Sequence, residues 1–522
     1  MSPPWRGSPS NSLSLRTLAV LTVAAGAQGL SIAWPWDWIL PLGASIWWLQ
    51  LLGLAALVAE LRICHSTRQA LWTGLYFATI WLCGVFWWLY IAMHTYGGLH
   101  SLLAATAVAA LAGALALYYA AACALFFALR GKGVVPQAGL FAVLWMAAEM
   151  ARGTWLTGFG WGAIGYAHLE GPLSAFIPWV GAYGVSALAA ALAFLVAASL
   201  GQGLRFDRAV GATLLTLLAL GGAVKMSQMS WTEDNGPLAV TLLQGNIPQD
   251  EKFEPGSGVP LALDWYARAL DANQSALVVA PETAVPLLPQ QLPPEYWQAL
   301  EARFASHGQA ALIGIPLGNY KEGYTNSVWG LAPGLSTPWR YDKHHLVPFG
   351  EFIPPLFKWF TQMMNIPLGD FNRGGLGQAS FAWAGQRLAT HICYEDLFGE
   401  ELATRFTDAA AAPTIFVNLS NIGWFGNSVA IDQHLNISRM RALEFERPFV
   451  RATNTGATVM VDHAGRVTAS LPRATRGILE GIVQGRQGMT PFAWWAAYAG
   501  LGPLWCGVLV GVGLAWRKAR RR

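Results

Sequence analysis

The distribution of apolar and polar residues divides the chain into three parts. Long apolar runs with few charges fill residues 1–225, a block of mixed polarity covers 226–490, and one more apolar run precedes a basic tail within 491–522. A helix needs about 20 consecutive apolar residues to cross the hydrocarbon core of a bilayer. We therefore predict a membrane domain of seven spans, a separate domain of ordinary polarity, and a last span with its tail.

Eight apolar runs are interpreted as membrane-spanning helices. Trp or Tyr stands near the ends of several runs, as expected where a helix crosses the headgroup layer. The first run is interpreted as a retained span because no small-residue cleavage site follows it. The predicted spans are residues 17–33, 39–59, 71–93, 102–129, 134–150, 173–200, 209–224 and 491–516.

The short connections between these spans differ strongly in positive charge. Loops on the cytoplasmic side of a membrane carry the excess of Lys and Arg. One set of connections and ends holds thirteen such residues, whereas the opposing loops, 34–38, 94–101 and 151–172, hold Arg152 alone. Both termini are therefore predicted to be cytoplasmic and residues 226–490 to lie outside the cytoplasm. The thirteen are Arg6, Arg16, Arg62, Arg68, Arg130, Lys132, Arg205, Arg208, Arg517, Lys518, Arg520, Arg521 and Arg522.

Composition supports a membrane protein and excludes several other classes. Only 12% of the residues are charged, against about a quarter in soluble proteins. No basic stripe with interleaved aromatic residues occurs, which argues against a nucleic-acid partner. The five cysteines show neither zinc-site nor disulfide spacing, so no metal is expected. Cys393 alone lies in a region of ordinary polarity.

The block 226–490 alternates between strand-like and helical patterns. This alternation predicts an α/β sandwich or mixed sheet. The helical patterns cover 260–272, 294–306 and 433–446. The strand-like runs are 238–243, 276–280, 311–315, 388–392, 414–418, 449–453, 458–461 and 478–483.

Several polar residues follow these strands or stand in loops with Gly and Pro. Glu282 follows the run 276–280, Lys343 and Glu351 share one such loop, and Cys393 follows 388–392. Singly, Glu282 could be a turn carboxylate, Lys343 a solvated cation, and Cys393 a small buried apolar residue. Together they cover the roles of base, oxyanion stabiliser and thiol nucleophile in acyl transfer.

His391 is a rival base, because residues two apart on a strand face the same side. Its Cα atom would lie roughly 6–7 Å from that of Cys393, with the side chains parallel, which is long for a direct hydrogen bond. We therefore interpret His391 as structural.

The sequence resembles the apolipoprotein N-acyltransferase family of the nitrilase, or carbon–nitrogen hydrolase, superfamily. The resemblance covers nearly the whole chain, and the motifs that carry it lie in the block 226–490. They are PE (from 281), KHHLVPFGE (from 343), CYE (from 393), LLQGNIPQ (from 242), LVPFGEFIP (from 346), FNRG (from 371), WFG (from 424), QH (from 433), RMRALEFERP (from 439) and RATNTG (from 451). The chain departs from the pattern at Phe253, where the family often has Trp, and at 421–423, where it often has Asn-Asp-Ala.

The resemblance implies an eight-span helical bundle with an α-β-β-α sandwich on the periplasmic face of a bacterial inner membrane. It implies transfer of a fatty acyl chain from a membrane phospholipid to the N-terminal amine of a diacylglyceryl-cysteine apolipoprotein, through a cysteine thioester and without a cofactor. Cys393 would be the nucleophile, Glu282 the general base and Lys343 the oxyanion support. Glu351, Tyr394 and Glu395 would be supporting residues.

Substrate-binding positions are predicted at Phe253, Trp359, Phe360 and Trp424. The apolar run 352–368 contains two of them and follows Glu351 directly. It either packs onto the sandwich as core or dips into the outer leaflet as a lid that brings acyl chains to Cys393.

Two other functions are compatible with parts of the sequence. A membrane-tethered amidase or nitrilase acting on a soluble C–N substrate would use the same triad, but eight spans exceed what an anchor needs. A transporter with a binding domain would carry charges in the middle of its spans. Only Glu149 and Arg152, near one end of a span, fit that pattern.

Overall fold

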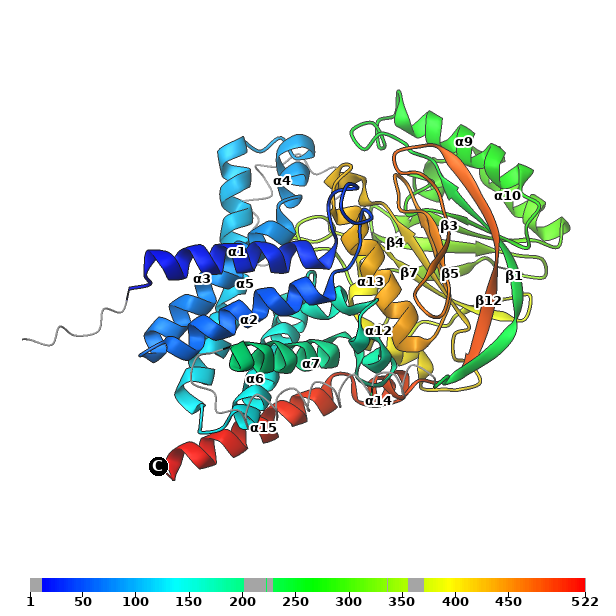
Figure 1. Cartoon of the computed structure of the whole chain (residues 1–522). Helices are drawn as coiled ribbons and strands as arrows, with labels where there is room; N and C mark the ends of the chain where they lie inside the picture. The colour runs from blue at the N-terminus through cyan, green and yellow to red at the C-terminus, as the bar shows by residue number, and fades with distance from the viewer. Residues whose placement is uncertain (1–11, 201–221, 223–228, 336, 355–369, 522) are drawn as a thin grey trace, which may run out of the picture.

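The protein was analysed as a computed structural model, which describes residues 12–200, 222, 229–335, 337–354 and 370–521. Helices occupy one side of the molecule and two β-sheets the other (Figure 1). The last helix runs along the helical side, and its C-terminal end lies far from the sheets (Figure 1). The chain therefore has a helical part and an α/β part, in the order that the apolar pattern predicts.

The helical part consists of strongly apolar segments with polar caps. Ser14 and Ser66 each begin a helix by accepting a hydrogen bond from a backbone N–H of its first turn. The helices are α1 (Leu15–Ile32), α2 (Trp47–Ile63), α3 (Thr67–Phe86), α4 (Leu89–Ile91), α5 (Ser101–Leu129), α6 (Val134–Thr154) and α7 (Ile177–Leu200). A π-helical turn, η1 (Ala92–Tyr96), follows α4.

The described residues contain five helical segments that are long and apolar enough to cross a membrane. A sixth is obtained if α14 (Pro491–Ala499) and α15 (Gly502–Arg520) are taken together, but these two helices meet at 87°. Gly500, with φ of 52°, ends α14 and permits the bend. The prediction of eight spans is thus not confirmed, and predicted span 209–224 lies outside the described residues except for Gly222.

Turns and short helical segments change the boundaries of the second and third predicted spans. The second begins at Trp47, because the Pro- and Gly-containing segment before it forms turns. The third ends at Phe86, after which the short α4 and the π-helical turn η1 replace a continuous helix.

The α/β part contains two six-stranded sheets. Their strand orders are β12-β1-β2-β3-β4-β5 and β11-β10-β9-β8-β7-β6. Each has a parallel centre, β1-β2-β3 or β7-β8-β9, with antiparallel strands at its edges. The strands are β1 (Thr232–Gln244), β2 (Leu277–Ala280), β3 (Ala310–Asn319), β4 (Gly323–Leu331), β5 (Trp339–Asp342), β6 (Phe381–Trp383), β7 (Gln386–Ile392), β8 (Ile415–Ser420), β9 (Phe449–Thr453), β10 (Val459–Val461), β11 (Val467–Ser470) and β12 (Gly477–Gly488).

All eight predicted strand-like runs coincide with strands. The strands that the pattern missed are β4, β5, β6 and β11. β4 begins with Gly and carries the polar run Thr325, Asn326 and Ser327, all of which are buried. β5 and β6 are short, and β11 is largely exposed, so none of them has the apolar alternation of a typical strand.

The two sheets pack face to face and are covered by helices on their outer sides. Val240, Val279, Val417 and Val450 belong to the core between the sheets. Helices α9 (Gly258–Ala272) and α10 (Pro294–Ser306) cover the first sheet, and α13 (Ala430–Phe445) covers the second (Figure 1). The predicted α-β-β-α sandwich is confirmed. The core beneath α13 is continuous with that of the helical part.

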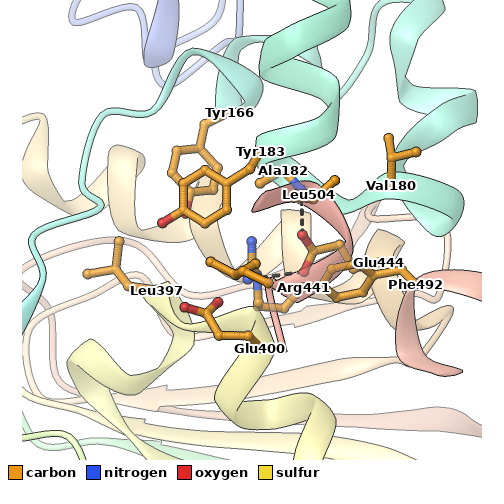
Figure 2. Close-up of a pocket in the computed structure, with 11 residues that line it drawn as sticks. Tyr166, Val180, Ala182, Tyr183, Leu397, Glu400, Arg441, Glu444, Phe492 and Leu504 are labelled. Carbon is orange, nitrogen blue, oxygen red and sulfur yellow. Dashed lines mark hydrogen bonds and ion pairs between the residues drawn. The ribbon is translucent and has the colours of Figure 1, made fainter. Parts of the chain in front are cut away.

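The seam between the two parts also contains buried charges. A pocket lies there between α7, α12 (Gly399–Ala403), α13 and α14 (Figure 2). Arg441 Nη1 lies 3.0 Å from Glu444 Oε2, and Glu444 Oε1 accepts a hydrogen bond of 2.7 Å from the N–H of Ala182 in α7. Burial raises the pKa of Glu400 and of Glu444 to about 7, although Arg441 opposes this shift. The helical part is therefore bound to the sandwich by polar as well as apolar contacts.

Close helix packing in the membrane part can be tested at Gly74. A methyl group there would lie 2.7 Å from Cys123 Sγ of α5, and small residues are what allow membrane helices to approach this closely. We expect Gly74→Ala to destabilise the protein by about 1–3 kcal/mol, measured as a lower unfolding temperature in detergent. Gly84→Ala in the same helix is the control, since nothing lies within 4 Å of its added methyl group. Equal unfolding temperatures for the two variants would contradict the close contact.

Candidate active site

The predicted catalytic residues lie just beyond the carboxyl ends of three strands. Glu282 follows β2 and Pro281, Lys343 follows β5, and Cys393 follows β7. Lys343 and Glu282 are in direct contact, and both act electrostatically on the Cys393 thiol. The two sheets thus bring together Glu282 and Cys393, which lie 111 positions apart in the sequence, with Lys343 between them in the chain.

Glu282 is 7% exposed and its two carboxylate oxygens have separate partners. Oε2 accepts a hydrogen bond of 2.8 Å from the backbone N–H of Asn421, directly after β8. Oε1 accepts one of 2.7 Å from Asn326 Nδ2 and lies 3.4 Å from Lys343 Nζ. The carboxylate therefore joins the two sheets at this end.

Lys343 is shared between two carboxylates. Its Nζ lies 2.8 Å from Glu351 Oε1 and 3.4 Å from Glu282 Oε1. Asn326 Nδ2 donates 2.7 Å hydrogen bonds to the same two oxygens. Burial alone would lower the pKa of Lys343, but the charges of Glu351 and Glu282 outweigh it and raise the pKa above its ordinary value. Lys343 is therefore a fixed cation at neutral pH.

Cys393 has a left-handed backbone, with φ of 52°. This conformation is uncommon for residues other than glycine and typically marks a functional turn. It ends the strand, and Cys393 as a residue is intermediate between buried and exposed. Burial and then the charge of Glu282 raise the pKa of the thiol to about 12, while Lys343 acts in the opposite direction. The resting thiol is thus protonated and needs a base to react.

Glu395 supports the turn through hydrogen bonds to backbone N–H groups. It accepts hydrogen bonds from Ile392 N at 2.6 Å, from His344 N at 2.7 Å and from the hydroxyl of Tyr341. Ile392 immediately precedes Cys393, and His344 immediately follows the lysine of the site. Glu395 therefore fixes the segments that carry the thiol and the ammonium relative to each other.

Tyr394 connects the turn to the helical part. Its hydroxyl donates a 2.9 Å hydrogen bond to the carbonyl oxygen of Gly158, in the loop after α6. Arg152 holds that loop by donating to the carbonyls of Phe159 and Trp161 at 2.6 and 2.7 Å. Arg152 was assigned to a short loop by the sequence, but it lies in α6 and is 1% exposed.

The predicted substrate-binding residues have different outcomes. Phe253 is half-buried, and the half-buried Trp424 packs edge to face on Tyr96 of the helical part, with ring centroids 5.9 Å apart. Trp359 and Phe360, with most of the predicted apolar arm, lie outside the described residues.

His391 lies on the outer side of the second sheet, where its ring meets Phe416 and Phe449 edge to face. Burial lowers its pKa to about 3. These contacts support its interpretation as a structural residue.

Two polar residues of the site were not found by sequence reasoning. Asn326 was missed because its strand, β4, lacks an apolar pattern. Lys252 is 1% exposed and donates a 3.0 Å hydrogen bond to the carbonyl oxygen of Glu282. Burial lowers the pKa of Lys252 to about 7. A lysine after the IPQ motif was the available signal, but a Lys in a polar loop is ordinarily solvated.

No group of three or more His, Cys, Asp or Glu side chains in the described ranges is arranged to hold a metal ion. The site as described consists of a thiol, three carboxyl groups, two lysine side chains and the amide of Asn326. Such a set can transfer protons and stabilise an oxyanion around a sulfur nucleophile.

Comparisons with known proteins agree with this chemistry. Residues 24–195 match the model of the apolipoprotein N-acyltransferase N-terminal domain, and residues 239–487 match that of carbon-nitrogen hydrolase. An apolipoprotein N-acyltransferase of Verminephrobacter eiseniae is 55% identical over 505 residues, which is 92% of each chain. One of Ralstonia nicotianae is 45% identical over 91% of this chain and 90% of its own.

A solved carbon-nitrogen hydrolase from Helicobacter pylori G27 aligns with 47% of this chain and 89% of its own, at 16% identity and a TM-score of 0.36. That likeness is too weak to add to the assignment. The two family models and the extent of identity to the relatives are sufficient: the chain belongs to the apolipoprotein N-acyltransferase family.

Proposed function

We propose that this protein transfers a fatty acyl chain from a membrane phospholipid to the N-terminal amine of a diacylglyceryl-cysteine apolipoprotein. The observation that carries the proposal is the buried contact of Glu282 and Lys343 beside the left-handed turn of Cys393. Membership of the family supports the substrates. Cys393 is the nucleophile, Glu282 the base and Lys343 the oxyanion support.

In the first step Glu282 accepts the thiol proton, and the Cys393 sulfur attacks the ester carbonyl of the phospholipid. The resulting oxyanion needs preorganised donors. Two of the three N–H bonds of Lys343 are accounted for by Glu351 and Glu282 among the described contacts, and the third serves the oxyanion. The ester C–O bond then breaks, the leaving alkoxide takes the proton from Glu282, and lysophospholipid departs from a Cys393 thioester.

In the second step the free amine of the apolipoprotein attacks the thioester. The C–S bond breaks, the amine proton passes through Glu282 to the thiolate, and an amide is released. Thioesters react readily with amines, which explains the use of sulfur. A soluble amide substrate would need no contact between the site and the helical part, whereas Tyr394 donates to Gly158 of that part. This contact favours lipid-anchored substrates over the amidase alternative.

We place the α/β domain, 226–490, on the periplasmic side of the bacterial inner membrane, with both termini cytoplasmic. The ends of the helices support this orientation. Arg130 donates to the carbonyls of Leu61 and Cys64, which gathers two basic loops at one end. The opposite loops contact the α/β domain, as where Asn436 donates to the carbonyls of Ile32 and Gly43. The basic loops are therefore remote from the catalytic site.

The nucleophile is tested by substituting Cys393. Incubation with a phospholipid labelled in its acyl chain should give an acylated Cys393 peptide by mass spectrometry in the parent protein. Cys393→Ala should form no acyl-enzyme, and Cys393→Ser should be nearly inactive, because a hydroxyl is a far weaker nucleophile at neutral pH. Transfer at the parental rate by the alanine variant would refute the proposed mechanism.

Glu282→Gln should change the reactivity of the Cys393 thiol and the rate of catalysis in opposite directions. Removing the negative charge lowers the pKa of Cys393, so alkylation of Cys393 by iodoacetamide should become faster between about pH 8 and 10. Acyl-enzyme formation from phospholipid at neutral pH should nevertheless fall, because the base is lost. Both rates can be followed on the Cys393 peptide. Slower alkylation together with normal acylation would assign Glu282 a different role.

Lys343→Ala should reduce the rate of acyl-enzyme formation by about a hundredfold or more through loss of oxyanion stabilisation. The measurement is a single-turnover time course with the labelled phospholipid. A variant that retains the parental rate would exclude Lys343 from oxyanion support.

The orientation is tested with a reporter that is active only outside the cytoplasm. Four predicted spans precede Gly131 and seven precede Ser230. A fusion after Ser230 should therefore be active and a fusion after Gly131 silent. The reverse pattern would place the catalytic domain in the cytoplasm and overturn the proposed location.

A further inference from the structure

The strained turn of Cys393 is held by two side chains that take no part in the mechanism above. The carbonyl oxygen of Cys393 accepts hydrogen bonds from Asn418 Nδ2 at 3.1 Å and from His434 Nε2 at 3.2 Å. Asn418 belongs to β8, the neighbour of β7, whereas His434 comes from α13. The carbonyl is thus fixed from both the sheet and the helix that covers it.

The contacts of His434 define its tautomer. Arg451 Nη2 lies 2.6 Å from His434 Nδ1, and because a guanidinium can only donate, Nδ1 is the acceptor. The proton therefore resides on Nε2, which faces the Cys393 carbonyl and, at 2.8 Å, Asp396 Oδ1. His434 is consequently a neutral donor with no lone pair directed at the thiol side, so it cannot serve as a base there.

His434 belongs to a buried cluster of hydrogen-bonded side chains. Ser438 Oγ donates to Asp396 Oδ2 at 2.5 Å and accepts from Arg451 Nη1 at 3.0 Å. His434, Asp396, Ser438 and Arg451 are each 0–1% exposed. Arg451 and Asp396 offset each other's charge, and the low local dielectric strengthens the hydrogen bonds of this buried cluster, although Arg451 Nε has no partner among the described residues. The cluster can therefore hold the carbonyl in one position.

Gln433, the residue before His434, is held by the helical part. Its Oε1 accepts hydrogen bonds from the indole N–H of Trp88 at 2.9 Å and of Trp161 at 2.8 Å. Trp88 follows α3, and Trp161 lies in the loop that Arg152 holds. The ring of Trp161 also packs on the ring of His434, with centroids 5.2 Å apart. Two consecutive residues thus connect the membrane helices to the turn of Cys393.

We propose that Gln433 and His434 are positioning residues, through which the membrane helices hold the Cys393 thiol in its reactive orientation. The inference rests on the proposed role of Cys393 as nucleophile. His434 acts on the carbonyl of Cys393, and Gln433 fixes His434 against the helical part. A displacement of about 1 Å in such a group can cost about a hundredfold in rate.

The first test compares His434→Ala, His434→Gln and His391→Ala by single-turnover acylation with labelled phospholipid. His434→Ala should lower the maximal acylation rate about 10- to 100-fold with little change in the phospholipid concentration at half-saturation. His434→Gln should recover much of the rate, because its amide N–H can still donate to the Cys393 carbonyl. His391→Ala also removes a buried imidazole on the side of the sheet that α13 covers. Because the hydrogen bond of His391 goes to the carbonyl oxygen of Ala389 and not to that of Cys393, the rate of this variant should stay within about threefold of the parent.

The second test removes the donors to Gln433 and keeps the aromatic rings. The double variant Trp88→Phe with Trp161→Phe should slow acylation about tenfold or more, without loss of folding. Trp81→Phe is the matched control: Trp81 is fully buried in the same bundle, and its indole N–H has no hydrogen-bond partner among the described residues. It should acylate at the parental rate.

The two sets of variants distinguish the possible failures. Parental acylation by His434→Ala, or by the double tryptophan variant, overturns the positioning role while Cys393→Ala remains inactive. Equal loss in the double tryptophan variant and in Trp81→Phe overturns it too, because packing would then explain both. If Cys393→Ala itself transfers acyl chains, the proposed function fails instead. Should His434→Ala not fold, His434→Gln and the tryptophan variants decide the question.

Discussion

The site depends on one ammonium group shared by two buried carboxylates. Glu282 and Glu351 come from different segments, and without a cation between them their desolvation and mutual repulsion would oppose folding of this region. The ammonium group of Lys343 offsets that cost, because its Nζ lies 2.8 Å from Glu351 Oε1 and 3.4 Å from Glu282 Oε1. Since Asn326 donates to the same oxygens, the register of β4 and β5 is tied to the position of the base. The contacts that stabilise this region therefore also hold Glu282 and Lys343 next to each other, as base and cation of the site.

The nucleophile is held by a different device. Hydrogen bonds hold its turn on both sides. Glu395 accepts from the backbone N–H of Ile392, directly before Cys393, and the carbonyl oxygen of Cys393 accepts from the amide of Asn418 and the imidazole of His434. The helical part contributes to this rigidity at Gly158 and at the two indoles that bind Gln433. The helical part therefore supports the turn of Cys393 through hydrogen bonds, in addition to anchoring the protein.

Much of this arrangement was predictable from sequence, for identifiable reasons. Cys393, Glu282 and Lys343 stood out because each ends a strand or interrupts a Gly- and Pro-containing loop, and the family motifs gave their roles. Asn326 was not predictable, since burial turns an ordinary polar residue into a bridge between carboxylates. The QH motif was recognised, but Gln433 meets a partner 345 residues away, a contact that no local pattern encodes. Helix boundaries were missed where turns and bends override hydrophobicity, as at Gly500.

The contacts of the loop after α6 have a consequence for how the molecule is made. A ribosome delivers the chain from its N-terminus, so Arg152 and the backbone that it holds exist before any residue of the second sheet has been synthesised. The surface that receives Tyr394 and Gln433 can then assemble in the membrane before α13 emerges. The helical part can thus serve as a template for the second sheet and α13, which are synthesised later. The α/β domain produced alone would have to form the Cys393 turn without the contacts of Tyr394 and Gln433 to the helical part.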